Sequence, residues 1–440
     1  MSTPSQTTRS AELYERAQRV LPGGVSRNTV LRDPHPVYAD HGVGCRITDI
    51  EGVTRLDFSN NMASLIHGHA CPAIVEAVTA QLARGSAFTT ATEVEVRYAE
   101  HLVGRNPNFE KLRFVNSGTE ALMVSLKAAR AYTGRPKIAK VEGAYHGGYD
   151  YAEVSQAPNP DTWGEIDQPN SVALAHGTPG SALGDVVIIP FNDPERAIAI
   201  LNKHADELAC VLLDLMPHRV GLRPADPEFV AAIREWATKH GSLLVLDEVI
   251  TFRTEHGGLQ SRYDITPDLT AIGKMIGGGF PVGAVVGRSE VMEVLNPRAK
   301  RVLYPHSGTF SANPISTTAG LVAMELFDEP AVARLNALAA RAMKGIDTAA
   351  RQAGVPVCVT GSGSMFRVHM KPQPPRNFRE AYLTPEENSR LKALLEYMFD
   401  EGFILINTCS ATLSTPMTEA EIDELVGAFE RGFEKMAVSV

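Results

Sequence analysis

The chain lacks several features that would place a protein quickly in a class. It has five cysteines in 440 residues, scattered as Cys45, Cys71, Cys210, Cys358 and Cys409, and no CxxC pair. This argues against a structural zinc site and is typical of a protein from a reducing compartment. No apolar run is long enough to span a bilayer, and the polar N-terminal stretch lacks the hydrophobic segment of a signal peptide. We therefore expect a cytoplasmic protein.

An excess of positive charge is also missing. The chain has 42 Lys and Arg against 51 Asp and Glu, a net charge of −9. That balance argues against a nucleic-acid binder and against a protein of the membrane surface. The glycine-rich stretches "HGVG" and "TGSGS" have neither the GxGxxG pattern of a dinucleotide fold nor the GK[ST] of a P-loop. The expected partners are therefore small molecules.

What the sequence does contain is an alternation of strand and helix patterns. Continuous aliphatic runs, typical of strands covered on both faces, occur in "KLRFVNSG", "PKIAKVEG", "DVVIIPF", "ACVLLDL", "SLLVLDEV", "LTAIGK" and "PVGAVVG". Helical segments lie between them, such as "EALMVSLKAARAYTG", where Leu122, Leu126 and Ala129 share one face. This alternation predicts an α/β fold with a mostly parallel sheet and helices on both sides.

The two ends of the chain have a different pattern. A chain of 440 residues is too long for one small core. We expect a large ligand-binding domain over residues 66–320 and a small α+β domain built from residues 1–65 and 321–440. The last helix should open with Thr418 and Glu421 in capping-box spacing.

Polar residues follow several of the predicted strands. They are Asn116 to Thr119, Tyr145 with His146, Asp214, Asp247 and Lys274. Ligands of open α/β sheets bind beyond the carboxyl ends of the strands, so one ligand could contact most of these residues.

Each of these residues also has a purely structural interpretation. Ser117, Gly118 and Thr119 offer free N–H groups and hydroxyls at a helix start, which suits a phosphate, but the hydroxyls could simply cap the helix. Asp247 could be held ionised by a cation of the ligand or form a structural ion pair. Lys274 in apolar surroundings could be a nucleophilic amine, or its stem could be buried with the charge in water.

Together these residues match the three groups by which proteins bind pyridoxal 5′-phosphate. Residues 117–119 would hold its phosphate, Asp247 would pair with its protonated ring nitrogen, and Lys274 would bind its aldehyde. Tyr145 could stack on one face of the ring. Val249, two residues beyond Asp247 and so on the same side of an extended strand, could pack on the other.

The motifs "NSGTEA", "AYHGG", "LLVLDEV", "PDLTAIGKMIGGGFPVGAVVG" and "HSGTFSANP" resemble, in order and spacing, the class III (fold type I) pyridoxal-phosphate-dependent aminotransferases. The resemblance implies that Lys274 forms the Schiff base, that Asp247 pairs with the ring nitrogen, and that residues 117–119 bind phosphate. It places Tyr145, His146, Val249 and Ile250 around the cofactor. It also implies a homodimer in which Gly308 and Thr309 reach the partner's phosphate.

The substrate signals are mixed. "LPGGVSRNTV", "DEVITFR" and "GTFSANP" resemble the branch that holds glutamate-1-semialdehyde 2,1-aminomutase and the β-amino-acid (β-phenylalanine-type) aminotransferases. In that branch "PGGVSR" makes Arg27 the anchor for the substrate carboxylate. The second, C-terminal arginine of the β-amino-acid enzymes is replaced here by Thr408, and Arg219 is a conceivable substitute.

The expected activity is therefore ping-pong transamination from a carboxylated amine, such as an aromatic β-amino acid, to a keto acid. An aminomutase, epimerase or decarboxylase on the same scaffold is the alternative. His67, His69 and Cys71 in "HGHAC" fit no strong zinc spacing, and we expect no metal there.

Overall fold

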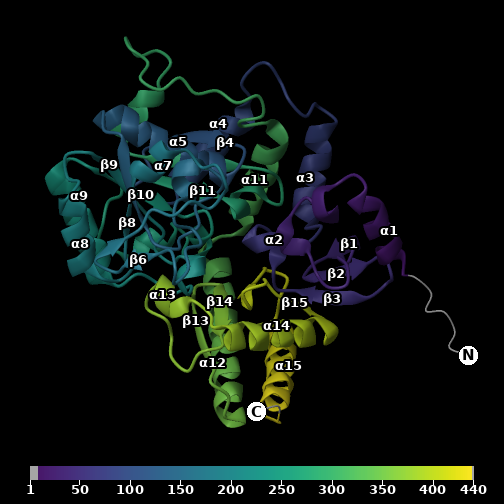
Figure 1. Ribbon diagram of the computed structural model, residues 1–440. Coiled ribbons are helices and arrows are strands. Elements are labelled where there is room, and N and C mark those ends of the chain that lie inside the picture. The colour runs from purple at the N-terminus through teal and green to yellow at the C-terminus, as the bar shows by residue number, and fades with distance from the viewer. Residues whose placement is uncertain (1–7, 439–440) are drawn as a thin grey trace, which may run out of the picture.

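The structure, a computed structural model, describes residues 8–438. All seven aliphatic runs form one sheet, in the order β4-β12-β11-β10-β9-β5-β8. Several of its strands are labelled in the blue and teal part of Figure 1. Their bounds are β4 Lys111–Val115, β5 Lys137–Val141, β8 Val186–Ile189, β9 Leu208–Leu213, β10 Leu243–Asp247, β11 Leu269–Gly273 and β12 Gly283–Gly287. Only β12 runs antiparallel to its neighbours, so the predicted mostly parallel sheet is confirmed.

Helices cover both faces of this sheet. On one face, Cys210 and Leu212 of β9 share a buried apolar cluster with Leu122 and Leu126 of α5 (Gly118–Thr133). On the other, alternate strand residues pack against α8 (Pro194–Asn202) and α9 (Pro227–His240). Strands buried on both sides have no polar face, which explains why their sequences are continuously apolar.

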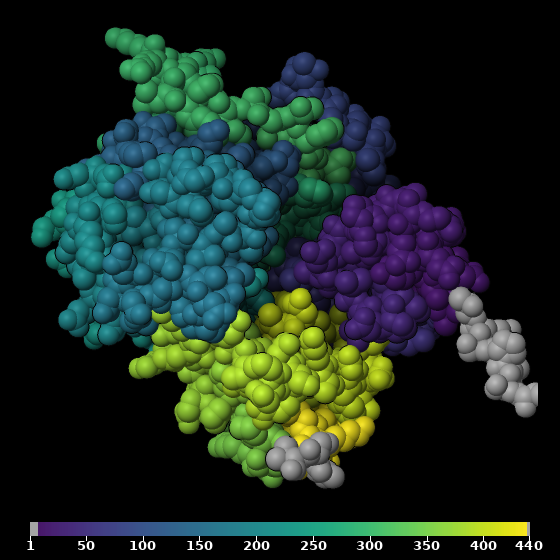
Figure 2. All heavy atoms as spheres, in the orientation of Figure 1, coloured from purple at the N-terminus to yellow at the C-terminus, as the bar shows by residue number. Residues whose placement is uncertain are grey.

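The two ends of the chain meet beside the large sheet. The antiparallel strands β1 (Ala39–Val43), β2 (Arg46–Asp49) and β3 (Thr54–Asp57) are extended by β15 (Phe403–Ile404), which pairs parallel with β3. A separate three-stranded sheet contains β13 (Cys358–Ser362), β14 (Met365–His369) and β16 (Ser410–Thr412). Figure 2 shows the purple N-terminal part and the yellow-green C-terminal part next to each other. The domain boundaries at residues 65 and 320 stay a prediction.

Long helices carry the C-terminal part. They are α12 (Glu329–Ala353), α14 (Pro385–Asp400) and α15 (Glu419–Val438). The capping box of α15 is half formed: the Glu421 carboxylate accepts from the N–H and the hydroxyl of Thr418, but the hydroxyl accepts from Ala420.

The remaining elements are shorter or lie around the large sheet. The helices are α1 Arg9–Gln18, α2 Asn60–Ala63, α3 Pro72–Leu82, α4 Glu93–Val103, α6 Asp150–Glu153, α7 Gly180–Gly184, α10 Ser289–Met292, α11 Pro314–Leu326 and α13 Phe378–Ala381. The hairpin β6 (Gly164–Glu165) with β7 (Gln168–Pro169) completes the strands.

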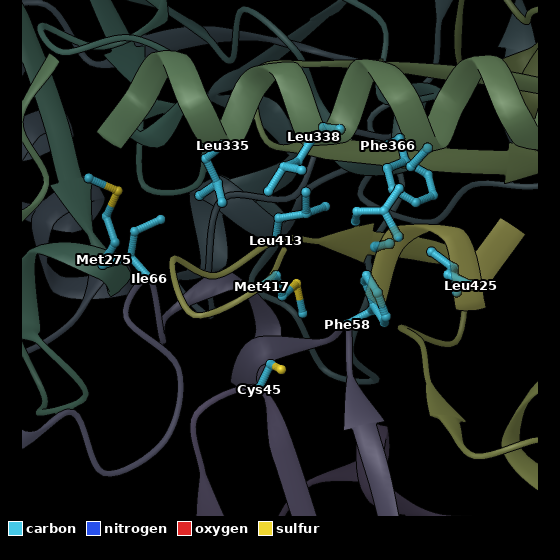
Figure 3. Packing of buried hydrophobic residues seen from close by; sticks show 14 of the residues in the cluster. Cys45, Phe58, Ile66, Met275, Leu335, Leu338, Phe366, Leu413, Met417 and Leu425 are labelled. Carbon is cyan, nitrogen blue, oxygen red and sulfur yellow. The ribbon is translucent and has the colours of Figure 1, made fainter. Parts of the chain in front are cut away.

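A buried apolar cluster joins the small sheets to the large one. Leu335, Leu338 and Leu425 from the long helices pack with side chains of both terminal segments (Figure 3). Met275, the residue after Lys274, belongs to the same cluster and is 1% exposed. The backbone at Lys274 is therefore fixed to the core on its C-terminal side. Among the helices formed by residues 8–438, none combines the length and apolar character needed to cross a bilayer.

Candidate active site

Asp247 and Lys274 lie at the same edge of the large sheet. Asp247 ends β10, and Lys274 directly follows β11, the neighbouring parallel strand. Lys274 has a left-handed backbone conformation, with φ of 51°. The chain turns sharply there, so the lysine side chain leaves the strand direction at the carboxyl end of the sheet.

The amine of Lys274 has no acidic partner within ion-pair distance in residues 8–438. Its Nζ donates to the backbone carbonyl of Met62 at 2.9 Å. Burial lowers the pKa of Lys274 from its ordinary value of 10.5, and the charge of Asp247 opposes that shift. An amine that loses its proton more easily is a better nucleophile.

The Asp247 carboxylate is held by hydrogen bonds on both oxygens. Oδ2 lies 2.8 Å from Nδ1 of the fully buried His146, and Oδ1 accepts from the backbone N–H of Val249 at 3.0 Å. Burial lowers the pKa of His146, so a neutral ring donates to the carboxylate. The loop after β5 thus turns the His146 ring towards β10.

The N-terminus of α5 combines a cap with free donors. Ser117 accepts from the N–H of Glu120 at 3.1 Å, which is the capping role that the sequence left open. The first N–H groups of a helix have no partner within it, and those of Gly118 and Thr119 form no hydrogen bond in the described chain. They remain available for an anion.

Close packing fixes the N-terminus of α5 against the strand ends. A Cβ on Gly118 would lie 2.7 Å from Cγ1 of Val249, and one on Gly283 would lie 2.1 Å from the Ser117 carbonyl oxygen. Neither glycine could carry a side chain without displacing Val249 or the Ser117 carbonyl. This close packing places the free N–H groups of α5 beside Val249, two residues after Asp247.

Val249 lies beside Asp247, but for another reason than the sequence indicates. The strand ends at Asp247, because that carboxylate takes the Val249 N–H and turns the chain. The inference from strand alternation is therefore wrong, although the Val249 side chain does pack between Gly118 and Gly273. Ile250 is half-buried and packs against the apolar cluster under β9.

Tyr145 projects from the loop after β5, with 54% of its surface exposed. Burial of its hydroxyl and the charge of Asp247 raise the pKa of its phenol. A fully buried lysine, Lys140, holds this loop by donating to the carbonyls of Ala144 and Val154 at 3.0 and 2.7 Å. Thr119 contacts the same loop, since its Oγ1 accepts from the N–H of Gly148 at 3.4 Å.

Arg27 reaches the same place from the N-terminal segment. Its Nη1 donates to Oδ1 of Asn61 at 2.7 Å, and its guanidinium forms no other hydrogen bond in the described chain. Asn61 directly precedes Met62, whose carbonyl holds Lys274. The exposed Arg27 head and the lysine amine therefore contact one four-residue turn, Asn60–Ala63.

This turn depends on an arginine that the sequence analysis missed. Arg253 is fully buried and has no acidic partner among the residues that the structure describes. It donates to Ser364 Oγ at 2.8 Å, to the Ala63 carbonyl at 3.4 Å and to the Leu413 carbonyl. "DEVITFR" places it six residues after Asp247, but nothing local reveals contacts that span 111 to 190 positions of sequence.

The remaining predicted residues lie around this centre. A Cβ on Gly308 would lie 3.6 Å from Nδ2 of Asn116 in the same chain, and Thr309 is exposed. Oγ1 of Thr408 lies 3.1 Å from Nε2 of His218. Each histidine of "HGHAC" has its own partners: His67 contacts Thr415 and Ala323, and His69 contacts Asp57.

The residues present fit pyridoxal phosphate. Free N–H groups at the start of α5 suit its phosphate, the carboxylate of Asp247 suits a protonated ring nitrogen, and the amine of Lys274 suits its aldehyde. Lys274 would exchange its single hydrogen bond to Met62 for the cofactor, and no ion pair would be broken.

Comparison with known proteins supports this assignment. The model of the family "Aminotransferase class-III" matches residues 29–432. A curated glutamate-1-semialdehyde 2,1-aminomutase from Heliobacterium modesticaldum is 34% identical over 98% of this chain and 97% of its own.

Two solved structures share the fold along nearly the whole chain. An omega-transaminase from Sphaerobacter thermophilus is 45% identical with a TM-score of 0.95, covering 99% of each chain. A beta-phenylalanine aminotransferase from Variovorax paradoxus is 32% identical with a TM-score of 0.84, covering 96% of this chain and 93% of its own.

Both the fold type I architecture and the family expected from the motifs are confirmed. The chain belongs to the class III aminotransferases and is an enzyme that depends on pyridoxal phosphate.

Proposed function

We propose that the protein transfers an amino group from a carboxylated amine, a β-amino acid in particular, to a keto acid. The observation that carries this proposal is the position of Lys274 at the carboxyl edge of the sheet, directly after the strand next to that of Asp247. Within the described part of the chain its amine forms no ion pair. When bound, the cofactor supplies an aldehyde that exchanges amino groups and a ring that takes up electrons from the adjacent carbon.

The residues of the chain divide the remaining work. Lys274 would hold the aldehyde of the cofactor, and its amine would accept and donate the proton at the carbons that exchange the amino group. Asp247, held by His146 and the Val249 N–H, keeps the ring nitrogen protonated. Ser117, Gly118 and Thr119 would bind the phosphate, Tyr145 would stack on one face of the ring, and Val249 would pack on the other.

Arg27 binds the donor carboxylate in this proposal. Only Nη1 is used by Asn61, so two further edges of the guanidinium are free to take a carboxylate with paired hydrogen bonds. The Asn61 link keeps Arg27 one residue from Met62 and hence near the lysine amine. A β-amino acid has its carboxylate one bond further from the reacting carbon than an α-amino acid, which suits an anchor on a separate segment.

A half-reaction screen tests the proposal. The enzyme loaded with the aldehyde form of the cofactor is mixed with single α-amino, β-amino and ω-amino acids and with uncharged arylalkylamines. Conversion of the cofactor to its amine form is followed by absorbance. Fast conversion by β-amino acids, and release of the matching keto acid, is the expected result. No conversion by any carboxylated amine would contradict the proposal.

The second candidate is the aminomutase reaction, favoured by the name of the curated relative at 34% identity. A mutase returns the amino group to the same carbon skeleton and therefore needs no external keto acid. Turnover of an amino aldehyde in the absence of any acceptor would establish it, whereas strict dependence on a keto acid would exclude it. The aminomutase pattern has "SPVR" after the Gly-Gly turn and "EPV.GN" at a strand end, whereas this chain has "SRNTV" and "DLMPHRVG". Both differences argue for the transaminase.

The protein is also expected to work as a homodimer. Large apolar side chains are exposed on two segments: Val75, Leu82, Phe88, Val302, Leu303 and Phe310. Residues 87–95 and 309–314 line one small cavity, so these segments are neighbours, and they meet along the upper edge in Figure 2. An exposed apolar patch of this kind is typical of a protein interface. Gly308 and Thr309 lie within it and would reach the partner's phosphate site.

A further inference from the structure

Two arginines beside the site have no acidic partner in residues 8–438. Arg219 lies in the short 3-10 helix His218–Val220, which follows β9, and Arg367 lies in β14. The Nε atom of each is buried without a hydrogen-bond partner. Arg367 is buried and Arg219 is half-buried. Withdrawing a guanidinium from water without an anion is costly, so a site that retains two such groups is prepared for a negatively charged ligand.

Arg219 belongs to the edge of the sheet that carries Asp247. Leu213 at the end of β9 pairs with Leu246 of β10, so the segment that contains Arg219 starts beside Asp247. Burial raises the pKa of the Tyr145 phenol and the charge of Asp247 adds to this, while the charge of Arg219 opposes it. The arginine therefore acts on the ring that stacks in the site.

The backbone around Arg219 is held by hydrogen bonds from neighbouring segments, whereas its guanidinium forms none in the described residues. The carbonyl of His218 accepts from Nη1 of Arg367 at 3.1 Å, and Nε2 of His218 lies 3.1 Å from the hydroxyls of both Thr408 and Ser410. On the other side, the Gly221 carbonyl accepts from Thr360 at 2.5 Å. This frame holds the arginine in place without using its guanidinium.

The two carboxyl groups at this edge of the sheet, Asp214 and Asp247, form no ion pair with Arg219 in the described residues. Asp214 accepts from the Met216 N–H at 2.8 Å, and burial together with the charge of Asp247 raises its pKa well above the usual range. Both effects disfavour a charged Asp214 carboxylate. Asp247 is already bonded to His146 and Val249. Burial, followed by the charges of Arg367, Lys274 and Arg219, lowers the pKa of His218 to about 3, so this ring is neutral.

We propose that Arg219 is a second carboxylate-binding residue, and that it takes the carboxylate of the keto-acid acceptor. This inference rests on the proposed transaminase function. It assigns the carboxylate of the amino donor to Arg27 and the carboxylate of the keto-acid acceptor to Arg219. The acceptor has its carboxylate directly on the reacting carbon, so the group that binds it must lie close to the sheet edge. Arg219 comes from the strand next to that of Asp247, whereas Arg27 reaches the site through Asn61. Arg367 stands behind His218 and adds positive charge to the same side.

The test compares acceptors with and without a carboxylate. Enzyme carrying the amine form of the cofactor is mixed with pyruvate or with propanal, and the return of the aldehyde form is followed by absorbance. The variants are R219Q, R219K and the matched control R223Q. Arg223 lies in the same loop but pairs with Asp226 at 2.9 Å, so R223Q removes the same charge outside the site.

R219Q should lower kcat/KM for pyruvate by about a hundredfold, in the range for removing one partner of a buried charge pair, and change the value for propanal by only a few-fold. R219K should lose about tenfold on pyruvate, because an ammonium cannot form two parallel hydrogen bonds. R223Q should change neither. Propionate, which has the carboxylate but no carbonyl, should inhibit the parent competitively against pyruvate and inhibit R219Q far more weakly.

Equal losses on pyruvate and propanal would overturn the inference and leave Arg219 as a support for Tyr145. Unchanged inhibition by propionate would overturn it too. If R219Q does not fold, R219K and its propionate inhibition decide the matter. Failure here is distinguishable from failure of the proposed function, because conversion of the cofactor by β-amino acids needs no acceptor.

Discussion

The amine of Lys274 donates a 2.9 Å hydrogen bond to the backbone carbonyl of Met62. Met62 lies in the turn Asn60–Ala63, in which all four residues have positive φ, from 47° to 69°. Left-handed conformations of this kind cost roughly 1–2 kcal/mol for each residue with a side chain, so they persist only where the surroundings impose them. Here Arg253 binds the Ala63 carbonyl, and Asn60 donates to the Thr412 carbonyl at 2.7 Å. The reactive amine is thus placed by backbone that distant parts of the chain hold in position.

Replacing Lys274 with alanine should abolish transamination while the cofactor still binds. The phosphate donors of α5 and the carboxylate of Asp247 remain, but the amine that exchanges with the substrate and moves the proton is gone. Cofactor binding is measured by equilibrium dialysis, and turnover is measured with a β-amino acid. Lys274→Ala that sustains substantial steady-state turnover would show that another residue does this work.

Asp247→Asn should bind the cofactor but react more slowly, by the equivalent of a few kcal/mol in the barrier, because a neutral amide cannot keep the ring nitrogen protonated. Asp214→Asn is the matched control. It alters a buried carboxyl that follows the adjacent strand β9, where burial and then the charge of Asp247 raise the pKa well above the usual range and so disfavour the charged form. The half-reaction rate of each variant is compared with that of the parent. Similar losses in both would refute the special role of Asp247.

The sequence predicts the large sheet well because each of its strands is buried on both faces. The continuous apolar runs follow directly from that burial. Asp247 and Lys274 could be predicted as neighbours because parallel strands end at one edge of a sheet. Their surroundings could not: His146 and Asp247 are 101 positions apart, and Lys274 and Met62 are 212 apart.

The sequence predicts the turn at Asn60–Ala63 only weakly. Two consecutive asparagines tolerate the left-handed region better than most residues, but Met62 and Ala63 do not, so local preference argues against four such residues in a row. Val249 was placed for the wrong reason because a side-chain hydrogen bond ends β10, and that bond has no periodic signature. The contacts that shape the site are thus single long-range hydrogen bonds, which periodicity does not encode.

Lys140 should make the stability of the fold depend on pH. Its pKa falls from 10.5 to about 7, because burial disfavours the charged form. Between these values the unfolded chain binds more protons than the folded chain, so the free energy of unfolding rises with pH, by at most about 1.4 kcal/mol per pH unit from this one group. Below pH 7 this contribution is flat.

The variant Lys140→Met isolates the effect. Its free energy of unfolding should show a smaller rise between pH 7 and pH 10 than that of the parent. Denaturant unfolding at fixed protein concentration measures both. Parallel pH profiles for the two proteins would mean that Lys140 keeps an ordinary pKa in the fold.

Thr309→Ala should weaken cofactor affinity by about 1.5–3 kcal/mol if its hydroxyl bonds the phosphate. If Thr309 acts across the dimer, mixing this variant with Lys274→Ala chains gives heterodimers with one intact site, and the mixture recovers activity. Gly308 lies against Asn116 of its own chain, so the alternative is that Thr309 serves the site of its own chain. No recovery despite proven subunit exchange would place Thr309 in its own chain's site or outside any site.

Arg27→Ala should raise KM for β-amino acids steeply and change KM for an uncharged arylalkylamine little. A hydrogen bond to a charged group contributes about 1.5–3 kcal/mol, and only the carboxylated donor forms such bonds with Arg27. The matched variant is Asn61→Gly, which removes the amide that holds Arg27 but tolerates the φ of 48° at this position. It should raise KM for β-amino acids moderately, because the arginine remains but is less well placed. Steady-state kinetics with each donor at a saturating keto acid separates these effects. A KM increase of equal size for charged and uncharged donors would exclude Arg27 as the carboxylate anchor, and the β-amino-acid assignment would then lose its main support.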